Sequence, residues 1–362
     1  MPVCLAAHCF TIAIMLSRCH HAATAPHAPH TYTQMPTVPR SILLVVLLIT
    51  AAASLLLAVS LGSASLSPGE ALDSLLGKGD PLLAELVREL RLPRALAAFG
   101  TGAALAIAGV MMQVLLRNPL ADPYILGTSG GAAAAALVAM TLGFSGLVLD
   151  AAAFAGALGS TLLVFGLTRA GDGWSSGRLL LTGVVTAAGW GAVITLLLAL
   201  APDTNLRGML FWLMGDFSYV ANPWPAVLAA GAAVIAGVAL AKPLNLLSSG
   251  AAQAAIHGLE VQRVHIALYF ISALLTAIAV TTAGTIGFVG LVIPHLIRLL
   301  SGSDHRIVVP CAALAGGSLL VLADLLARTA VAPRQLPVGA ITAAIGVPLF
   351  LLLLRRSQSS QQ

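Results

Sequence analysis

Long apolar runs separated by short polar segments fill the chain from residue 41 almost to its end. The runs are rich in Leu, Ala, Val and Gly, and most approach the roughly 20 residues that an α-helix needs to cross a bilayer. Outer-membrane barrels instead alternate apolar and polar residues in segments of about ten, and no such alternation is present. The pattern predicts ten membrane-spanning helices, at about residues 41–61, 95–115, 124–142, 148–168, 178–200, 223–241, 262–283, 286–300, 307–328 and 336–354.

The composition indicates the same class of protein. The chain is 59% hydrophobic and 9% charged, and its mean hydropathy is +0.97. A soluble domain of average composition carries about 25% charged residues, so this chain lacks the polar shell that a large soluble core needs. We therefore predict an all-α integral membrane protein.

Two of the predicted spans are irregular. Span 124–142 is short and contains the glycine-rich run GTSGGAAAAA, whereas span 286–300 contains Pro294, His295 and Arg298. Spans interrupted by Gly or Pro lie inside a helix bundle or beside a pathway, where protein or water satisfies the freed backbone groups. We expect Pro294 to break its short helix inside the bundle and His295 to pack near one membrane interface.

The distribution of charge predicts an orientation. With the N-terminus inside, the outer segments beyond residue 40 hold seven basic and nine acidic residues, and the inner segments hold ten basic and four acidic ones. Basic residues are enriched in cytoplasmic loops, so both termini are predicted to be cytoplasmic. The inner basic residues are Arg40, Arg117, Arg169, Arg178, Lys242, Arg263, Arg298, Arg306, Arg355 and Arg356.

One connection differs from an ordinary loop. Residues 242–263 are too polar to span the membrane and are predicted to form short surface helices separated by Gly250 and Gly258. Such a segment is either a docking surface for a cytoplasmic partner or a plain connector.

No energy source for transport is evident in the chain. A P-loop places a Ser or Thr directly after its Lys, but Lys78 precedes Gly79 and Lys242 precedes Pro243. The acids lie near helix ends, and the most embedded, Asp324, precedes Arg328 by one turn, so this pair is expected to neutralise itself.

Enzyme chemistry is not predicted either. His257, His265, His295 and His305 lack the spacing of metal ligands on one helix. We therefore expect no catalytic residue, cofactor or metal site, and a permease driven by separate subunits. The alternative is a secondary transporter that uses an ion gradient to move a small organic or metal-chelate solute.

Several motifs resemble those of the permease subunits of ABC importers for iron siderophores, haem and cobalamin. They are RLPRALAAFGTGAALAIAGVMMQVLLRNPLADPYILGTSGG from Arg91, NLRGMLFWLMGDF from Asn205, GFVGLVIPHLIRLLSGSDHR from Gly287, ADLLAR, QLPVG and ITAAIGVPLF. The resemblance covers about residues 41–356 and implies the ten-helix fold of type II ABC importer permeases. It also implies a homodimer in the inner membrane, two cytoplasmic ATP-binding subunits and an external substrate-binding protein. The implied cargo is an iron chelate, either a siderophore or haem, or cobalamin.

The resemblance also assigns roles to individual residues. Arg91, Arg94 and Arg328 match arginines that receive carboxylates of the binding protein, although they could simply flank a span or pair with Asp324. The ATPase coupling loop maps to Leu247, Gly250, Ala254, His257 and Gly258, with Ala251 where the family commonly has Glu. The inner gate maps to Ser176 and Gly177, although a glycine has no side chain to close a gate. The pathway is implied to follow the dimer axis, along spans 178–200 and 336–354.

The resemblance divides the chain into three parts. Residues 1–40 have no counterpart and are expected to be an added extension, with five histidines that could bind metal, or an over-long start that makes Met35 the first residue. Residues 41–356 form the permease domain, and residues 357–362 a polar tail.

Overall fold

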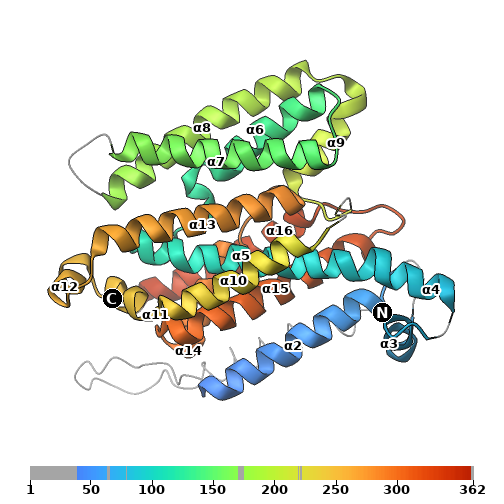
Figure 1. The fold of residues 1–362 in the computed structure, drawn as a ribbon, viewed down its shortest axis with the longest axis horizontal. Helices are drawn as coiled ribbons and strands as arrows, with labels where there is room; N and C mark the ends of the chain where they lie inside the picture. The colour runs from blue at the N-terminus through green and yellow to red at the C-terminus, as the bar shows by residue number, and fades with distance from the viewer. Residues whose placement is uncertain are drawn as a thin grey trace. The chain divides into compact units, whose positions relative to one another are not determined.

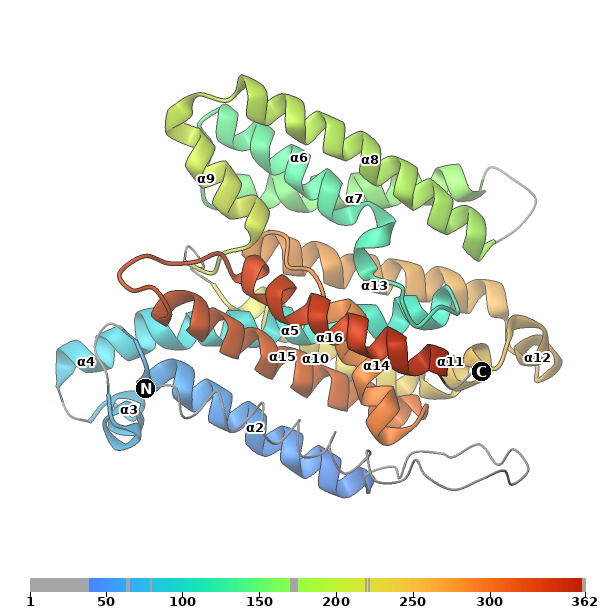
Figure 2. The same ribbon diagram turned by 180° about the vertical axis from the view of Figure 1, so that it is seen from behind.

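The computed structural model describes residues 39–62, 66–78, 80–169, 175–218, 220 and 222–359, with side chains described up to residue 353. The predictions for residues 1–38 and 360–362 lie outside the described residues. All regular elements in the described part are helical (Figures 1 and 2). They are α2 (Arg40–Ser60), α3 (Pro68–Leu75), α4 (Pro81–Glu85), η2 (Leu86–Arg91), α5 (Leu92–Leu115), η3 (Pro123–Leu126), α6 (Thr128–Thr141), α7 (Leu147–Arg169), α8 (Ser176–Leu200), α9 (Asp203–Met214), α10 (Trp224–Ala239), α11 (Ala241–Ser248), α12 (Ala251–Ile256), α13 (Val261–Ala283), α14 (Val289–Ser301), α15 (His305–Thr329) and α16 (Val338–Ser359).

Each of the ten predicted spans corresponds to a helix. Among the described residues, six helices are long and apolar enough to cross a membrane, and the apolar helix α10 meets α11 at a bend of 64°. The shorter apolar helices are α6, α14 and α16. The predicted surface helices of residues 242–263 are α11 and α12, and Gly250 and Gly258 both have positive φ angles.

Helix α5 forms the centre of the core. Nearly all of its residues are buried, and it packs against α10, α13, α14 and α15. Glycine allows the closest approaches: a Cβ atom on Gly102 would lie 2.3 Å from the Gly316 carbonyl oxygen, and one on Gly109 would lie 1.9 Å from that of Gly290. Helices in lipid associate by van der Waals packing rather than by a hydrophobic force between them, so these contacts hold α14 and α15 on α5.

Helices α6, α7, α8 and α9 form a second group that packs on α13, seen at the top of Figure 1. In α8 the buried residues are Leu179 and Gly183. The indole N–H of Trp190 donates to the Ser160 hydroxyl at 2.8 Å, which ties α8 to α7. Most of the apolar surface of α8 therefore remains available for lipid or for another protein chain.

The structure corrects the expected role of Pro294, because α14 runs through this residue without a break. A proline at this position cannot donate to the carbonyl of Gly290, four residues earlier. The side-chain amide of Gln113 on α5 instead donates to the carbonyls of Gly290 and Leu291, at 3.4 and 3.0 Å. The carbonyls beside the proline are thus satisfied from a neighbouring helix, which keeps the helix intact.

Candidate functional site

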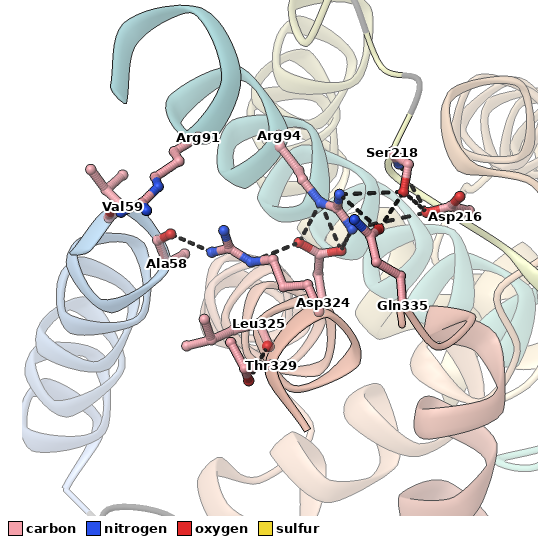
Figure 3. Close-up of polar contacts among 11 residues, drawn as sticks. Ala58, Val59, Arg91, Arg94, Asp216, Ser218, Asp324, Leu325, Thr329 and Gln335 are labelled. Carbon is pink, nitrogen blue, oxygen red and sulfur yellow. Dashed lines mark hydrogen bonds and ion pairs between the residues drawn. The ribbon is translucent and has the colours of Figure 1, made fainter. Parts of the chain in front are cut away.

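The three arginines assigned to docking gather at the end of the bundle that carries α3 and α4, called the α3 end below (Figure 1). Figure 3 shows Arg91 and Arg94 there. Arg91 ends η2, Arg94 lies in the first turn of α5, and Arg328 lies in the last turn of α15. Asp324, one turn before Arg328 on α15, is 2% exposed and lies between Arg94 and Arg328. Tertiary packing therefore brings the predicted residues together around one buried carboxylate.

Arg94 is the main partner of Asp324. Its Nε lies 2.9 and 3.1 Å from the two carboxylate oxygens, and its Nη2 lies 2.8 Å from Oδ1. Its Nη1 donates to Ser218 and Gln335, each at 3.3 Å, and Asp216 lies 3.9 Å from Nη2. Every guanidinium nitrogen of Arg94 thus has an internal partner, in the bidentate geometry that makes arginine–carboxylate pairs strong.

This geometry corrects the expectation that Asp324 and Arg328 simply neutralise each other. Their closest charged atoms, Arg328 Nε and Asp324 Oδ2, are 3.9 Å apart, so Arg94 holds the carboxylate more directly. Arg328 also donates from Nη2 to the carbonyl of Ala58 in α2. The reason is geometric. Asp324 and Arg328 project from the same face of α15, so only the ends of their side chains approach each other, whereas Arg94 reaches Asp324 from the neighbouring helix α5.

Arg91 is buried and connects α5 to α2. Its Nη1 donates to the carbonyls of Val59 and Ser60, at 2.8 and 3.0 Å, and Figure 3 shows Arg91 beside Val59. A cation at a helix C-terminus is favoured by the unpaired carbonyls there. The three arginines therefore hold α2, α5 and α15 together, whatever they do toward a partner.

The coupling segment, α11 and α12, lies at the opposite end of the bundle, called the α12 end below (Figure 2). Leu247 and Ala254 are fully buried, so these two predicted residues anchor the segment rather than face a partner. Gly258 ends α12 with φ +80°, and the N–H groups of Gly258 and Leu259 donate to the carbonyls of Ala255 and Ala254. Such a helix C-terminus favours glycine.

Helix α12 presents its other face to the surroundings. His257 is exposed, and its Nδ1 lies 2.8 Å from the carbonyl oxygen of Gln253. Ile256 is 82% exposed on the same helix. Ile256 was not among the residues assigned from the sequence.

A polar cluster joins α11 to the turn between α14 and α15. The Asn245 amide donates to Asp304 Oδ1 at 3.0 Å, and its oxygen lies 3.0 Å from the His305 backbone N and 2.6 Å from His305 Nδ1. Asp304 also caps α15 by accepting from the Arg306 N–H. The hydrogen bond from Asn245, together with that from Arg306, holds the pKa of Asp304 below its usual range. The carboxylate therefore stays ionised at neutral pH.

The residues assigned to the gate begin α8. The Ser176 hydroxyl lies 3.4 Å from the carbonyl oxygen of Leu115 at the end of α5, and Gly177 is exposed. Nothing in these contacts tests a gating role, which stays a prediction.

A cavity of about 310 Å³, open to the surroundings, lies where the two short helices α6 and α14 begin. Its wall includes Tyr124, Ser129 and Gly130 near the start of α6, and Thr285 and Gly287 before α14. Ile194 of α8 and Leu213 of α9 complete its sides, with Ala133. The Tyr124 hydroxyl bonds to both the N–H and the carbonyl of Ile286, at 3.0 and 3.1 Å, which fixes the two loops together.

Comparison with known proteins identifies the family. The model of the FecCD transport family matches residues 46–356. The chain belongs to the FecCD transport family. It is 42% identical over 282 residues to the hemin transport system permease protein HmuU of Yersinia pestis, which covers 75% of this chain and 84% of that protein. It is also 42% identical over 276 residues to the cobalamin import system permease protein BtuC of Halobacterium salinarum, covering 75% and 73% of the two chains.

A solved structure supports the same fold for this FecCD protein. An ABC transporter assigned to the metal-chelate type, in an inward-facing conformation, matches with a TM-score of 0.77 and 30% sequence identity, covering 87% of this chain and 99% of that one. The chain is thus a multi-pass membrane protein and a permease of the FecCD type.

Sequence reasoning missed the polar partners of the predicted site residues in this FecCD permease. Asp216, Ser218 and Gln335 lie beside Arg94, and Asn245 lies beside Asp304. Two of them stand within quoted motifs: Asp216 in NLRGMLFWLMGDF and Gln335 in QLPVG. A polar residue inside an otherwise apolar motif was the available signal.

Proposed function

We propose that this chain forms, as a homodimer, the membrane permease of a binding-protein-dependent ABC importer in the inner membrane. Two cytoplasmic ATPases act on the α12 end, and a substrate-binding protein docks on the α3 end. Both termini are cytoplasmic in this proposal. The observation that carries it is the match to permeases of importers over three quarters of the chain.

The distribution of charge supports the proposed orientation. Arg40, Arg298 and Arg306 lie at or near the α12 end, where Asp304 and α11 meet. Basic residues mark the cytoplasmic side of a membrane protein. The α3 end carries acids such as Glu70 and Asp73 in addition to its arginines.

The inner partner is proposed to contact α12. This helix combines a buried anchor, Ala254, with the exposed side chains of Ile256 and His257. A short, anchored helix with an exposed apolar tip fits a cleft in a partner. The departure at Ala251 removes one carboxylate, so apolar contact at Ile256 takes a larger share of the docking.

The outer partner is proposed to present carboxylates to Arg91, Arg94 and Arg328. These three cations exceed Asp216 and Asp324 by one charge, which favours an acidic partner. Arg94 already binds Asp324. A carboxylate of the partner would therefore bind Arg94 either in addition to Asp324 or in place of one of the internal contacts of Arg94.

Charge reversal at the arginines tests this docking. Arg94→Glu is expected to weaken docking of the binding protein, and more at low salt, where exposed charges are least screened. Arg207→Glu, at an exposed arginine of α9, is the control for a charge reversal outside the arginine cluster. Equal docking by wild-type protein and Arg94→Glu, with the variant shown to be folded, contradicts the assignment.

The substrate class is an iron chelate, a siderophore or haem, or cobalamin. The relatives named above are a hemin permease and a cobalamin permease. The largely exposed, Leu-, Ala- and Gly-rich surface of α8 suits a bulky substrate that passes without tight binding.

Uptake into proteoliposomes tests the function. Permease, ATPase and binding protein are reconstituted together, and haem, a ferric siderophore and cobalamin are offered separately. We expect uptake of one class that requires both ATP hydrolysis and the binding protein. Uptake that persists without the ATPase, or that an ionophore abolishes while ATP is intact, supports an ion-driven secondary transporter instead.

A further inference from the structure

Asn245, Asp304 and His305 form a polar contact between α11 and the start of α15. This contact is more specific than apolar packing alone would need to hold α11 in place. Leu244 and Leu247 already bury α11 against the bundle. Apolar contacts are non-directional and tolerate sliding. One side-chain amide that makes three hydrogen bonds to two consecutive residues of a turn instead sets both the position and the direction of the contact.

Asn245 holds the residues that begin α15, Asp304 and His305, and the turn that they close is joined directly to the end of α14. Residues 302–304 follow α14, whose 13 residues run without a break because Gln113 satisfies the carbonyls near Pro294. The other end of α14 is the loop that carries Thr285 and Gly287 into the cavity wall. Helix α14 therefore connects this turn to residues of the cavity wall.

The far end of α14 is also fixed to the cavity wall. Ile286 is held on both its N–H and its carbonyl by the Tyr124 hydroxyl, and the Thr285 hydroxyl donates to the carbonyl of Leu213. Tyr124 and Leu213 both line the cavity. Movement of α14 must therefore shift or break contacts of the cavity wall.

We propose that Asn245 is the positioning residue that links the ATPase-docking segment to the cavity. Its amide locks α11 to the turn at Asp304 and His305, so motion of α11 and α12 passes along α14 to Thr285, Gly287 and Tyr124. This inference rests on the proposed function, since it requires an ATPase that moves α12. It assigns the stretch SDH, which leads into α15, a role in transmission.

Asn245→Ala removes the three hydrogen bonds and leaves the exposed face of α12 unaltered. In the reconstituted complex, we expect ATP hydrolysis to continue, while substrate taken up per ATP falls about tenfold, an ordinary size for coupling between two sites. Asp304→Ala is expected to have the same effect. Asp304→Asn keeps an oxygen for the Asn245 amide and for the α15 cap, and is expected to restore coupling.

Ser248→Ala is the matched control on α11. Its hydroxyl donates to the carbonyl of Asn245 within the same helix and does not reach the turn. Uptake per ATP should equal that of the wild type. If Asn245→Ala fails to assemble with the ATPase, Asp304→Ala decides the question, because it leaves the sequence of α11 intact.

A second measurement follows the accessibility of the cavity wall and needs no substrate. Ser129→Cys is introduced after the four native cysteines are replaced, and its rate of labelling by N-ethylmaleimide is measured with and without ATP and vanadate. With Asn245 present, we expect the rate to depend on nucleotide; with Asn245→Ala, we expect this dependence to vanish while hydrolysis persists.

The outcomes separate the inference from the proposed function. Absence of ATP-dependent uptake in the wild-type complex rejects the function. Uptake that is ATP-dependent in the wild type and equally well coupled in Asn245→Ala and Asp304→Ala rejects the inference. The inference is also rejected if the labelling rate of Ser129→Cys does not depend on nucleotide when Asn245 is present.

Discussion

At the scale of single residues, buried charge is the main feature of this permease. Asp324 is 3% exposed at its side chain and faces Arg94, which is 15% exposed. Burying a charge is costly unless it is paired and hydrogen-bonded. Here each guanidinium nitrogen of Arg94 is satisfied, so the pair is tolerated and ties α5 to α15.

Asp324→Ala is expected to destabilise the protein strongly. It leaves Arg94 and Arg328 without their shared carboxylate, and breaking a buried pair from one side costs about 3–5 kcal/mol. The free energy of unfolding is measured by denaturant titration in mixed micelles. Asp73→Ala, at an exposed position of α3, is the control and should change it by less than about 0.5 kcal/mol. Equal stability of the two variants refutes a structural role for Asp324.

At the scale of elements, α14 shows how a helix accommodates proline in the core. Pro294 removes one donor, and Gln113 supplies another from α5. The close contact of Gly109 with the Gly290 carbonyl brings α5 near enough for that amide to reach. The proline and the glutamine thus form one structural unit, although 181 residues separate them in sequence.

Gln113→Leu tests this pairing. The variant leaves the buried Gly290 carbonyl, to which Pro294 cannot donate, without its side-chain donor, and we expect a loss of about 1–3 kcal/mol in the free energy of unfolding. Adding Pro294→Ala should recover part of that loss, because the new N–H can donate to Gly290. The double-mutant cycle therefore predicts a favourable interaction between the two substitutions. Simple additivity would count against the pairing.

At the scale of the whole molecule, the helices differ in how much of their apolar surface other helices cover. Helix α5 is almost entirely buried, whereas α8 leaves most of its side chains exposed. Lipid can cover such a surface, and so can a second copy of the chain. The proposed homodimer places α8 beside the shared pathway, where the cavity already includes Ile194.

Cysteine cross-linking tests that arrangement. Val185 is exposed on α8. In the variant Val185→Cys, we expect oxidation in membranes to form a disulfide bond between two copies of the permease. Leu163→Cys, exposed on α7, is the control and should stay uncross-linked. Gel mobility without reductant measures the result. Cross-linking at α7 alone would place the dimer contact elsewhere.

The sequence by itself determined the fold class, the positions of ten apolar helices and the family. Hydropathy is a local property, and a bilayer demands helices of nearly constant length, so apolar runs mark the helices directly. The 12-residue helix α9 was not predicted as a separate element, because it is too short to read as a span.

Tertiary structure alone decided which polar groups meet. Arg94 and Asp324 are 230 residues apart, and Asn245 and Asp304 are 59 apart. Such pairings depend on which helices become neighbours and on how each is rotated about its axis, and spacing along one helix cannot encode either. That is why the arginines could be assigned from motifs, while their internal partners and the contact of α11 with the start of α15 became visible only in the folded chain.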